Sequence, residues 1–170
     1  EILVEGPAGT GKTRTILEFF NLLARTIKCR GLIVRQDAVT LTTTTLVTLN
    51  SQVLQPEYGV RFFGGNRHEP AAYRYPNGSE IVVGGMNDAR KIFSSEYDWI
   101  YWNEATDGTE EAWEMLTTRL RGGPTEVKRR IVGDCNPNAR THWLNRRCDA
   151  GKTRRIVTRL EDNPLYFDDD

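Results

Sequence analysis

The feature that most constrains the fold of this chain is a glycine-rich stretch near its start. Residues 2–4 are apolar, and they lead into Gly6-Pro7-Ala8-Gly9-Thr10-Gly11-Lys12-Thr13. The spacing of the outer glycines, the lysine and the threonine is that of a P-loop, whose backbone N–H groups surround a phosphate. The helix after a P-loop directs its N-terminal N–H groups at the same anion. The sequence therefore predicts a strand, a phosphate-binding loop and a helix.

Two side chains of this loop have predicted roles toward ATP and Mg²⁺. Lys12 is placed to reach the β- and γ-phosphates, where it also assists catalysis, and the Thr13 hydroxyl is placed to bind Mg²⁺. All eight residues of the loop, 6–13, are expected to contact the nucleotide. The alternative is an ordinary glycine-rich turn, which the complete motif between a strand and a helix argues against.

Apolar spacing beyond the loop predicts an α/β fold. Helical periodicity covers residues 12–28, with Gly31 suited to a C-terminal stop, and residues 32–35 form a buried apolar run. This strand–loop–helix–strand order is a βαβ unit, so we expect a mainly parallel central sheet with helices on both faces. Residues 40–54 keep helical spacing despite four consecutive threonines, and we expect a helix there.

The middle of the chain has the pattern of short strands. They are predicted at residues 60–63, 72–75 and 80–83, with a hairpin turn at 76–79, where Asn-Gly tolerates the positive φ that the turn needs. We interpret this segment as an antiparallel β-hairpin insertion at the edge of the parallel sheet.

The second half returns to buried strands and amphipathic helices. Strands are predicted at 99–102, 131–133 and 155–160, the first of them central and buried on both faces. Thr109 is expected to cap one helix, and Thr141 to cap a short helix that runs through Arg147. The four tryptophans are interpreted as core residues rather than as platforms for stacking bases.

ATP hydrolysis needs a group that holds the metal and a base that orients water. We expect both at the C-terminal tip of a strand beside the P-loop strand, and Asn103 and Glu104 follow such a strand. Glu104 is the candidate general base; the alternative is a solvated loop acid. Asn103 stands where an aspartate would support Mg²⁺ through water. Its amide carries no charge, so Asn103→Asp is expected to tighten Mg²⁺·ATP binding or to raise hydrolysis.

Other polar residues are candidates for supporting roles. Asp98 lies too far down its strand to replace the missing aspartate, whereas Asp107, beyond the tip, could replace it. Asn136 follows the next core strand and could sense the γ-phosphate, although the spacing alone favours an ordinary Asn-Pro turn. Arginines that could stabilise transition-state charge, alternatively ordinary surface residues, are Arg35, Arg90, Arg119 and Arg121.

Composition excludes several other classes of protein. The 170 residues carry 23 basic and 23 acidic side chains, so any contact with DNA has to use a local patch. The three cysteines form no CxxC pair, which argues against a zinc site and favours a reducing, cytosolic setting. No apolar run approaches the length of a membrane span, so no membrane partner is expected.

Taken together, these segments resemble the ATPase domain of the large terminase subunit, the motor that packages DNA into tailed-phage capsids. The matching segments, in chain order, are residues 4–13 (Walker A), 77–81 with 85–86 and 91–94 (a characteristic middle segment), 98–105 (Walker B with the catalytic glutamate), 116–121, 133–137 with 142–144 (the coupling motif) and 162–164 (the start of a linker). The middle and coupling segments discriminate best, since many NTPases share the two Walker motifs.

The resemblance implies an additional-strand, catalytic-glutamate (ASCE, RecA-like) P-loop fold. It also implies a magnesium-dependent ATPase that drives translocation of double-stranded DNA as a homo-oligomeric ring, with a portal protein and a small terminase subunit as partners. The setting would be the host cytoplasm and, transiently, the procapsid portal. Glu104 would activate water, Asn136 would couple hydrolysis to movement, and Arg35 or Arg90 would serve as the arginine finger.

The same resemblance suggests that residues 1–170 are a single ATPase domain cut from a longer protein. We expect the family's upstream adenine-contacting segment and its C-terminal nuclease domain to be absent, since the acidic residues 168–170 are consecutive rather than spread over a fold. Two alternatives remain at this point. One is another ASCE ATPase of helicase or recombinase type, and the other is a nucleotide-binding assembly module with little turnover.

Overall fold

A computed structural model describes residues 1–88, 92–123 and 126–163. Its strands are β1 (Ile2–Glu5), β2 (Arg30–Arg35), β3 (Arg61–Phe63), β4 (Ala72–Arg74), β5 (Glu80–Gly85), β6 (Trp99–Trp102), β7 (Arg130–Cys135) and β8 (Arg154–Val157). Its helices are α1 (Lys12–Thr26), α2 (Ala38–Thr43), α3 (Thr45–Thr48), α5 (Glu110–Thr117) and α6 (Trp143–Asp149).

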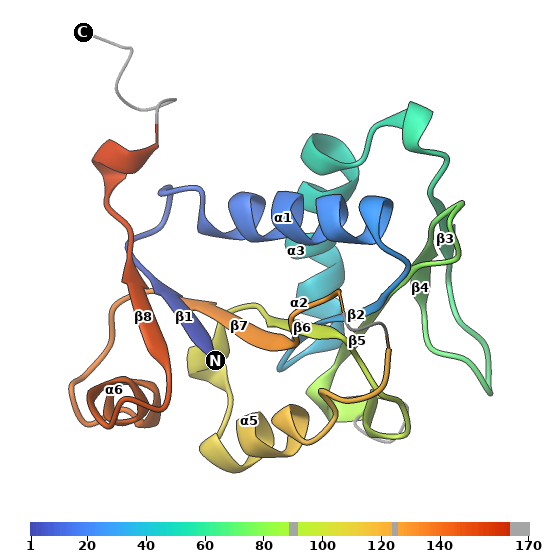
Figure 1. Cartoon of the computed structure of the whole chain (residues 1–170). Helices are drawn as coiled ribbons and strands as arrows, with labels where there is room; N and C mark the ends of the chain where they lie inside the picture. The colour runs from blue at the N-terminus through green and yellow to red at the C-terminus, as the bar shows by residue number, and fades with distance from the viewer. Residues whose placement is uncertain (89–91, 124–125, 164–170) are drawn as a thin grey trace, which may run out of the picture.

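Within the described ranges, eight strands form one sheet in the order β3-β4-β5-β2-β6-β7-β1-β8. The strands from β5 to β8 in this order run parallel to one another, while β4 pairs antiparallel with both β3 and β5. Helices α1 and α3 lie on one face of the sheet, and α5 and α6 lie on the other (Figure 1). The predicted α/β fold, with a mainly parallel sheet covered on both faces, is confirmed.

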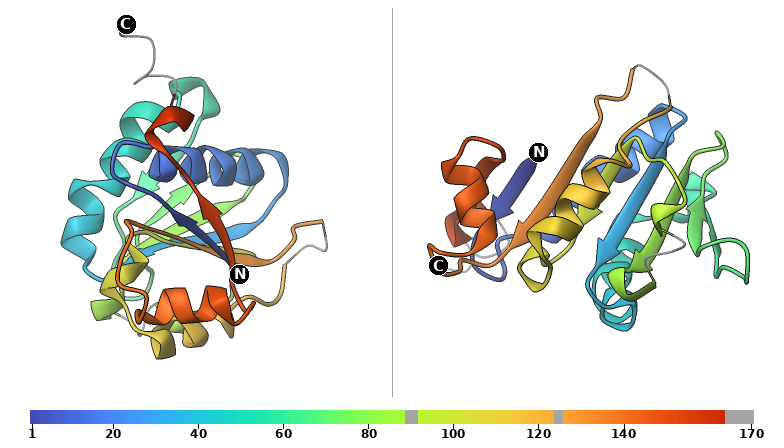
Figure 2. Two further views of the ribbon diagram at one scale, coloured as in Figure 1. Left: turned by 90° about the vertical axis from the view of Figure 1, so that its left-hand side faces the viewer. Right: turned by 90° about the horizontal axis from the view of Figure 1, so that it is seen from below.

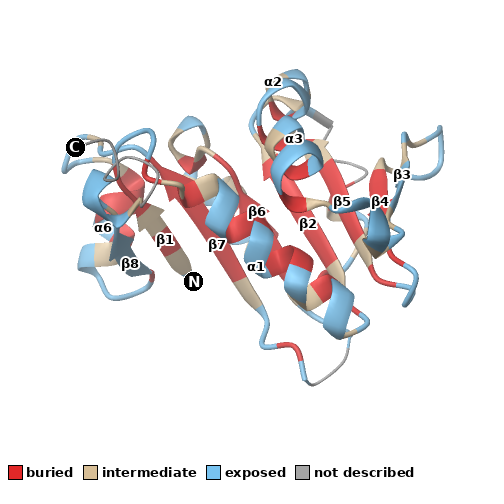
Figure 3. Cartoon of the chain, turned by 90° about the horizontal axis from the view of Figure 1, so that it is seen from above, coloured by how far each residue is buried: buried red, intermediate tan, exposed pale blue. Residues whose placement is uncertain are grey.

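The sheet separates two apolar cores. Strand β6 contributes to both, since Trp99 and Tyr101 pack on the α1 side while Ile100 and Trp102 pack on the α5 side. All four side chains are fully buried, and the Trp99 ring stacks on Phe20 of α1 with the centroids 3.9 Å apart. The central strands are accordingly buried along most of their length (Figure 3). The interpretation of the tryptophans as core residues is confirmed.

The predicted role of Gly31 as a helix stop is wrong. Helix α1 ends at Thr26, and Ile27 follows in an extended conformation. Gly31 lies inside β2, opposite Trp99 of β6. A Cβ atom at Gly31 would lie 2.0 Å from the Trp99 indole, so a glycine is required for these two strands to pack around that ring.

The helix predicted over residues 40–54 forms in three pieces. Helices α2 and α3 are separated at Thr44, whose φ of −123° and ψ of −75° are not helical, and a π-type turn covers Leu49–Val53. Threonine hydroxyls in this stretch donate to backbone carbonyls of the preceding turn, as Thr44 does to Thr40 at 2.7 Å. Such bonds compete with regular helix geometry, which accounts for the interruption.

The middle segment is only partly an edge insertion. The turn at 76–79 joins β4 to β5 as predicted, with Gly78 at a φ of 83°. Strand β5, however, extends to Gly85 and pairs in parallel with β2 over its whole length. It is therefore part of the main sheet, and the antiparallel edge consists of β3 and β4. Figure 2 shows this edge at one end of the sheet, with α6 and β8 at the other.

The strand that carries Glu104 does not lie beside the P-loop strand, contrary to our expectation. Strand β7 lies between them, pairing in parallel with β1 and with β6. In this register Val4 of β1 faces Asp134, and Trp102 of β6 faces Gly133. The end of β7 is therefore directly between the P-loop and the Asn103-Glu104 pair.

The helices of the second half begin and end close to the predicted positions. Thr109 caps α5, its Oγ1 accepting from the Ala112 N–H at 3.2 Å. For α6 the capping residue is His142 rather than Thr141, since the His142 Nδ1 accepts from the Leu144 N–H at 3.3 Å. Strand β8 begins one residue earlier than predicted and ends at Val157. Among the described residues, no helix has the length and apolarity needed to cross a membrane.

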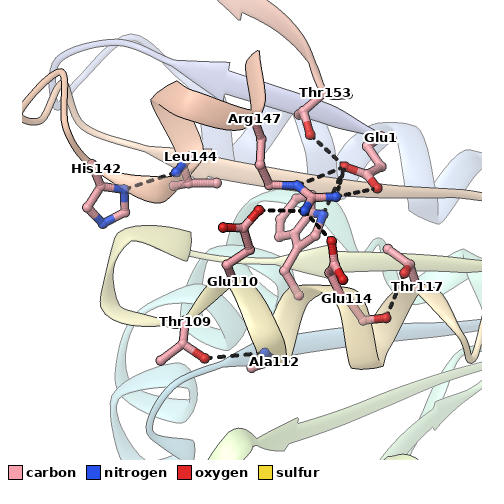
Figure 4. A network of polar contacts seen from close by, with 11 residues as sticks. Glu1, Thr109, Glu110, Ala112, Glu114, Thr117, His142, Leu144, Arg147 and Thr153 are labelled. Carbon is pink, nitrogen blue, oxygen red and sulfur yellow. Dashed lines mark hydrogen bonds and ion pairs between the residues drawn. The ribbon is translucent and has the colours of Figure 1, made fainter. Parts of the chain in front are cut away.

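A buried arginine joins α6 to α5 and to the start of β1. The Arg147 guanidinium, whose side chain is 4% exposed, donates to Glu1 at 2.9 Å, Glu110 at 2.8 Å and Glu114 at 2.6 Å. Thr153 also donates to the Glu1 carboxylate, at 2.6 Å. Figure 4 shows the guanidinium surrounded by these acids. We call the cluster of Arg147, Glu1, Glu110, Glu114 and Thr153 the Arg147 network.

Candidate nucleotide-binding site

A cavity of about 790 Å³ opens at the C-terminal ends of the parallel strands. This is the edge where open α/β sheets bind their ligands, and the volume is within the range of small-molecule sites. The lining residues are 8–15 of the P-loop and α1, Thr48, Gln52, Glu104, Asn136, Asp162 and Asn163. The structure thus brings Lys12, Glu104 and Asn136 together, although they are far apart in the sequence.

The P-loop has the backbone that its glycines predict. Gly11 is the N-cap of α1 and has a φ of 81°, a left-handed conformation that favours glycine. The buried Lys12 ammonium donates to the carbonyl oxygens of Gly6 at 2.6 Å and Pro7 at 2.8 Å. This positive charge and the N-terminal N–H groups of α1 therefore face the same cavity, an arrangement suited to a polyphosphate.

Glu104 has an unusual backbone and a partly buried side chain. Its φ of 51° makes it the one non-glycine residue with positive φ among those the structure describes. Such a strained conformation is typical of functional sites. No described residue makes a hydrogen bond or ion pair with its carboxylate, which lines the cavity. Burial and the neighbouring Asp134 raise the pKa of Glu104, while Arg35 and Lys12 lower it by a smaller amount.

Asp134, the most buried acid beside the cavity, is a residue for which the sequence motifs predicted no role. Its side chain is 1% exposed and accepts from four groups, namely the Thr13 hydroxyl (2.9 Å), the Tyr101 hydroxyl (2.9 Å), the Asn103 amide (3.1 Å) and the Glu104 N–H (2.8 Å). Burial raises its pKa, and the hydrogen bonds from Glu104, Thr13 and Tyr101, together with the charge of Lys12, oppose that shift. The available signal was an acid at the end of an apolar strand, residues 131–133, the same pattern that identified Glu104.

The Asn103 side chain turns its amide nitrogen toward Asp134 and its oxygen away. The oxygen accepts from Thr45 at 2.7 Å and from Arg35 at 3.2 Å. The polarity of these neighbours determines the orientation, because a guanidinium only donates and a carboxylate only accepts. The structure therefore gives no support to Asn103 as the residue that presents an oxygen to a metal.

The residues at this edge of the sheet have the chemistry that Mg²⁺ requires. Mg²⁺ prefers oxygen ligands, keeps several waters and is usually held by one or two protein groups together with phosphates. The Thr13 hydroxyl and the Asp134 carboxylate meet at 2.9 Å beside the cavity. The described residues contain no cluster of three acidic, histidine or cysteine side chains that could hold a metal by itself. The site therefore fits a metal that arrives with a nucleotide.

Asn136 lies at the P-loop. Its Oδ1 accepts from the Lys12 ammonium at 3.3 Å, and its side chain lines the same cavity. Asn136 is exposed and follows β7 directly, before Pro137. Its role as a sensor of the γ-phosphate stays a prediction.

The candidate arginines occupy different places. Arg35, at the end of β2, contacts Asn103 and lies 4.0 Å from Asp107, beside the site of its own chain. Arg119 donates to the Phe93 carbonyl and Arg121 pairs with Glu96, and neither lines the cavity. Arg90 is outside the described residues.

The two other aspartates that we considered do not reach the cavity. Asp98 is buried at the opposite end of β6, where it accepts from the Arg30 N–H at 2.8 Å. The Asp107 side chain is 54% exposed and is held near Arg35. The exclusion of Asp98 is therefore confirmed, and Asp107 is not among the residues that line the cavity.

Comparison with known proteins agrees with this arrangement. A family model described as phage terminase large subunit matches residues 1–166. The solved large terminase of a thermophilic bacteriophage has a TM-score of 0.75 at 14% identity, over 95% of this chain and 41% of that one. The complex of the same terminase with ATP-gamma-S has a TM-score of 0.69 at 14% identity, with coverages of 96% and 40%. No curated protein matched significantly.

A further solved structure, the large terminase ATPase domain of Thermus phage P74-26, has a TM-score of 0.54 at 11% identity, over 81% of this chain and 60% of that one. At such identities the likeness shows the fold, and it confirms the ASCE P-loop architecture. The chain spans less than half the length of the thermophilic phage terminase that it matches.

Proposed function

The chain belongs to the phage terminase large subunit family, and we propose that it hydrolyses ATP to drive double-stranded DNA into a procapsid. The observation that carries this proposal is the meeting of the P-loop, Lys12 and Glu104 at one cavity. A P-loop by itself binds a nucleotide, whereas a carboxylate on the opposite side of the phosphates provides the means to hydrolyse it.

Lys12, Thr13 and the loop residues 6–11 hold the nucleotide in this proposal. The Lys12 ammonium is already bonded to two loop carbonyls, so a phosphate would compete with them for the same positive charge. The Thr13 hydroxyl would hold Mg²⁺, which supplies positive charge to the phosphate oxygens when bound. The N–H groups at the start of α1 complete the anion site.

Glu104 acts as the general base that orients and deprotonates the attacking water. Its carboxylate has no partner among the described residues, so it is available to accept a hydrogen bond from water. Its raised pKa also makes it a better proton acceptor than an ordinary solvated glutamate. The strained backbone holds the side chain against the cavity.

Asn136 couples the chemistry to motion. It bonds Lys12 and follows the strand that lies between the P-loop strand and the Glu104 strand. Loss of the γ-phosphate would change the Lys12–Asn136 contact and thereby the position of the segment after β7. The family membership supports duplex DNA, a homo-oligomeric ring, the portal protein and the small terminase subunit as partners, in the host cytoplasm. Arg35 or Arg90 is the arginine finger in that ring.

The ATPase part of the proposal is tested by steady-state phosphate release. Glu104→Gln should reduce the turnover number by about 10²–10⁴-fold, the usual contribution of a general base, and leave ATP binding in place. The matched control is Glu111→Gln, the same change at an exposed position of α5, which should have no effect. Equal rates for wild type and Glu104→Gln would contradict hydrolysis and favour an assembly module.

The motor part requires the complete protein in a packaging assay with procapsids and linear duplex DNA. Glu104→Gln is expected to abolish ATP-dependent protection of the DNA from added nuclease. Strand separation instead of packaging would indicate a helicase and overturn the proposal.

A further inference from the structure

We propose that Asp134 is the carboxylate that supports Mg²⁺ in this site, and that Asn103 is a positioning residue for it. The inference rests on the proposed ATP site and assigns a role that the sequence motif had placed at position 103. In P-loop ATPases the metal is held by the loop Ser or Thr together with an aspartate. Here that aspartate comes from a different strand.

The Asp134 carboxylate contacts the P-loop directly. Thr13 is the loop residue expected to bind the metal, and its hydroxyl donates to Asp134 Oδ2 at 2.9 Å. Strand β7, which carries Asp134, is the neighbour of the P-loop strand, whereas Asn103 follows β6, one strand further away. The position of Asp134 on the sheet therefore brings its carboxylate to the loop.

Among the described residues, the Asp134 carboxylate has only uncharged hydrogen-bond partners, namely two hydroxyls, one amide and one backbone N–H. No lysine or arginine among these residues forms an ion pair with it. Hydrogen bonds donated to a carboxylate favour its charged form, and this carboxylate contacts Thr13 beside the cavity where a cation would bind with a nucleotide.

The short distance between Asn103 and Asp134 accounts for an uncharged residue at position 103. The Asn103 amide nitrogen lies 3.1 Å from one Asp134 oxygen and 3.3 Å from the other. An aspartate at 103 would place a second buried carboxylate at that distance, where two like charges cannot both be ionised without a large cost. The asparagine donates a hydrogen bond instead and fixes the Asp134 side chain. This revises our expectation for Asn103→Asp, which should not tighten Mg²⁺·ATP binding.

The test measures how strongly Mg²⁺ tightens binding of a fluorescent ATP analogue, as the ratio of affinities in Mg²⁺ and in EDTA. In Asp134→Asn this ratio should fall by about 10- to 100-fold, the usual effect of losing a group that supports a metal. The affinity in EDTA should remain at or above that of wild type, because a negative charge near the phosphates is removed. Thermal melting without nucleotide establishes that the variant is folded.

A charge exchange provides the sharpest comparison. Asn103→Asp alone should lower the melting temperature and leave the Mg²⁺ ratio unchanged or reduced. The double variant Asn103→Asp/Asp134→Asn, which places the carboxylate one strand further from the P-loop strand and beside Thr45 and Arg35, should keep the low ratio of Asp134→Asn. Asp107→Asn removes the competing acid beyond the strand tip and should leave the ratio at the wild-type value.

Three results would overturn the inference: an unchanged ratio in Asp134→Asn, a loss of the ratio in Asp107→Asn, or a tightening of Mg²⁺·ATP binding in Asn103→Asp. The last of these keeps Asp134 in place, so the inference can still be refuted if Asp134→Asn does not fold. A wild-type chain that binds no nucleotide, or whose binding survives Lys12→Ala, would refute the proposed function instead.

Discussion

Two buried charged side chains, Arg147 and Asp134, lie on opposite faces of the sheet and have different kinds of partner. Arg147, on the α5 and α6 side, is bonded to three carboxylates. Asp134, which contacts Thr13 at the start of α1, is bonded to neutral groups alone among the described residues. The first charge is paired with opposite charges within the fold, whereas the second has no ion pair among the described residues, and Lys12 favours its ionised form only by lowering its pKa.

This difference separates a structural role from a functional one. Burying a charge is costly, and partners of opposite charge offset that cost within the folded chain. The Arg147 network therefore stabilises the junction of three elements and has no need of a ligand. The hydrogen-bond partners of Asp134, which we call the Asp134 cluster, include the Thr13 hydroxyl at the edge of the cavity. A metal bound there would supply the opposite charge that these partners lack. Substitutions in the two clusters should accordingly separate stability from metal dependence.

The largest effect is expected from Arg147→Met. Removing one member of a buried ionic cluster costs about 3–5 kcal/mol, and the lower end applies here because Glu114 is more than half exposed. The free energy of unfolding, measured by urea denaturation, should fall by about 3 kcal/mol, while the Mg²⁺ dependence of ATP binding stays at its wild-type value. The control is Arg146→Met, the same change at the exposed neighbouring position. If folded Arg147→Met lost nucleotide binding, the Arg147 network would not have a purely structural role.

A smaller effect is expected from removing one hydroxyl from each cluster. Tyr101→Phe deletes a donor to Asp134, and Thr153→Val deletes a donor to Glu1 in the Arg147 network. Each should lower the free energy of unfolding by about 1–2 kcal/mol, the usual cost of a lost hydrogen bond to a buried group. Only Tyr101→Phe should also reduce the tightening of ATP binding by Mg²⁺, because it alone alters the carboxylate beside Thr13. If both variants lose Mg²⁺ dependence equally, the effect is a general loss of stability.

The smallest effect concerns the pH dependence of hydrolysis. The base must be ionised, so the turnover number falls as the pH drops through the pKa of Glu104, which burial and Asp134 raise above its ordinary value. Asp107 raises this pKa and Arg35 lowers it, so Asp107→Asn should move the acid limb of the profile to lower pH and Arg35→Gln to higher pH. Only the position of the limb is compared, because Arg35 is also a candidate arginine finger and its loss would lower the rate at every pH. Shifts of the same sign in both variants would show that the limb does not belong to Glu104.

The same pKa shift has a consequence for stability. Because the pKa of Glu104 is higher in the folded than in the unfolded chain, the folded state binds more protons between the two values. Stability therefore falls as the pH rises through this interval, and the ionised carboxylate destabilises the fold at neutral pH. Glu104→Gln should melt at a somewhat higher temperature than wild type at pH 7, as expected where activity requires a strained and charged side chain.

Much of the fold could be predicted because its signals are local. The run of residues 99–102 is apolar throughout, which is typical of a strand buried on both faces, and the structure confirms it. The Asn-Gly turn at 77–78 likewise has a strong local preference. The errors concern relations between elements, such as Gly31, whose requirement comes from Trp99 on the adjacent strand. No periodicity within residues 12–35 contains that information.

The sequence by itself determined the P-loop, the βαβ unit and the glutamate at the end of a buried strand, since each is encoded within a few neighbouring residues. Only the tertiary structure decided which carboxylate meets Thr13. The identity of this carboxylate depends on the order of the strands, in which β7 lies between β1 and β6. Asn103 and Asp134 are 31 positions apart along the chain. Their hydrogen bond arises only when the parallel strands align their C-terminal ends, which is a property of the assembled sheet.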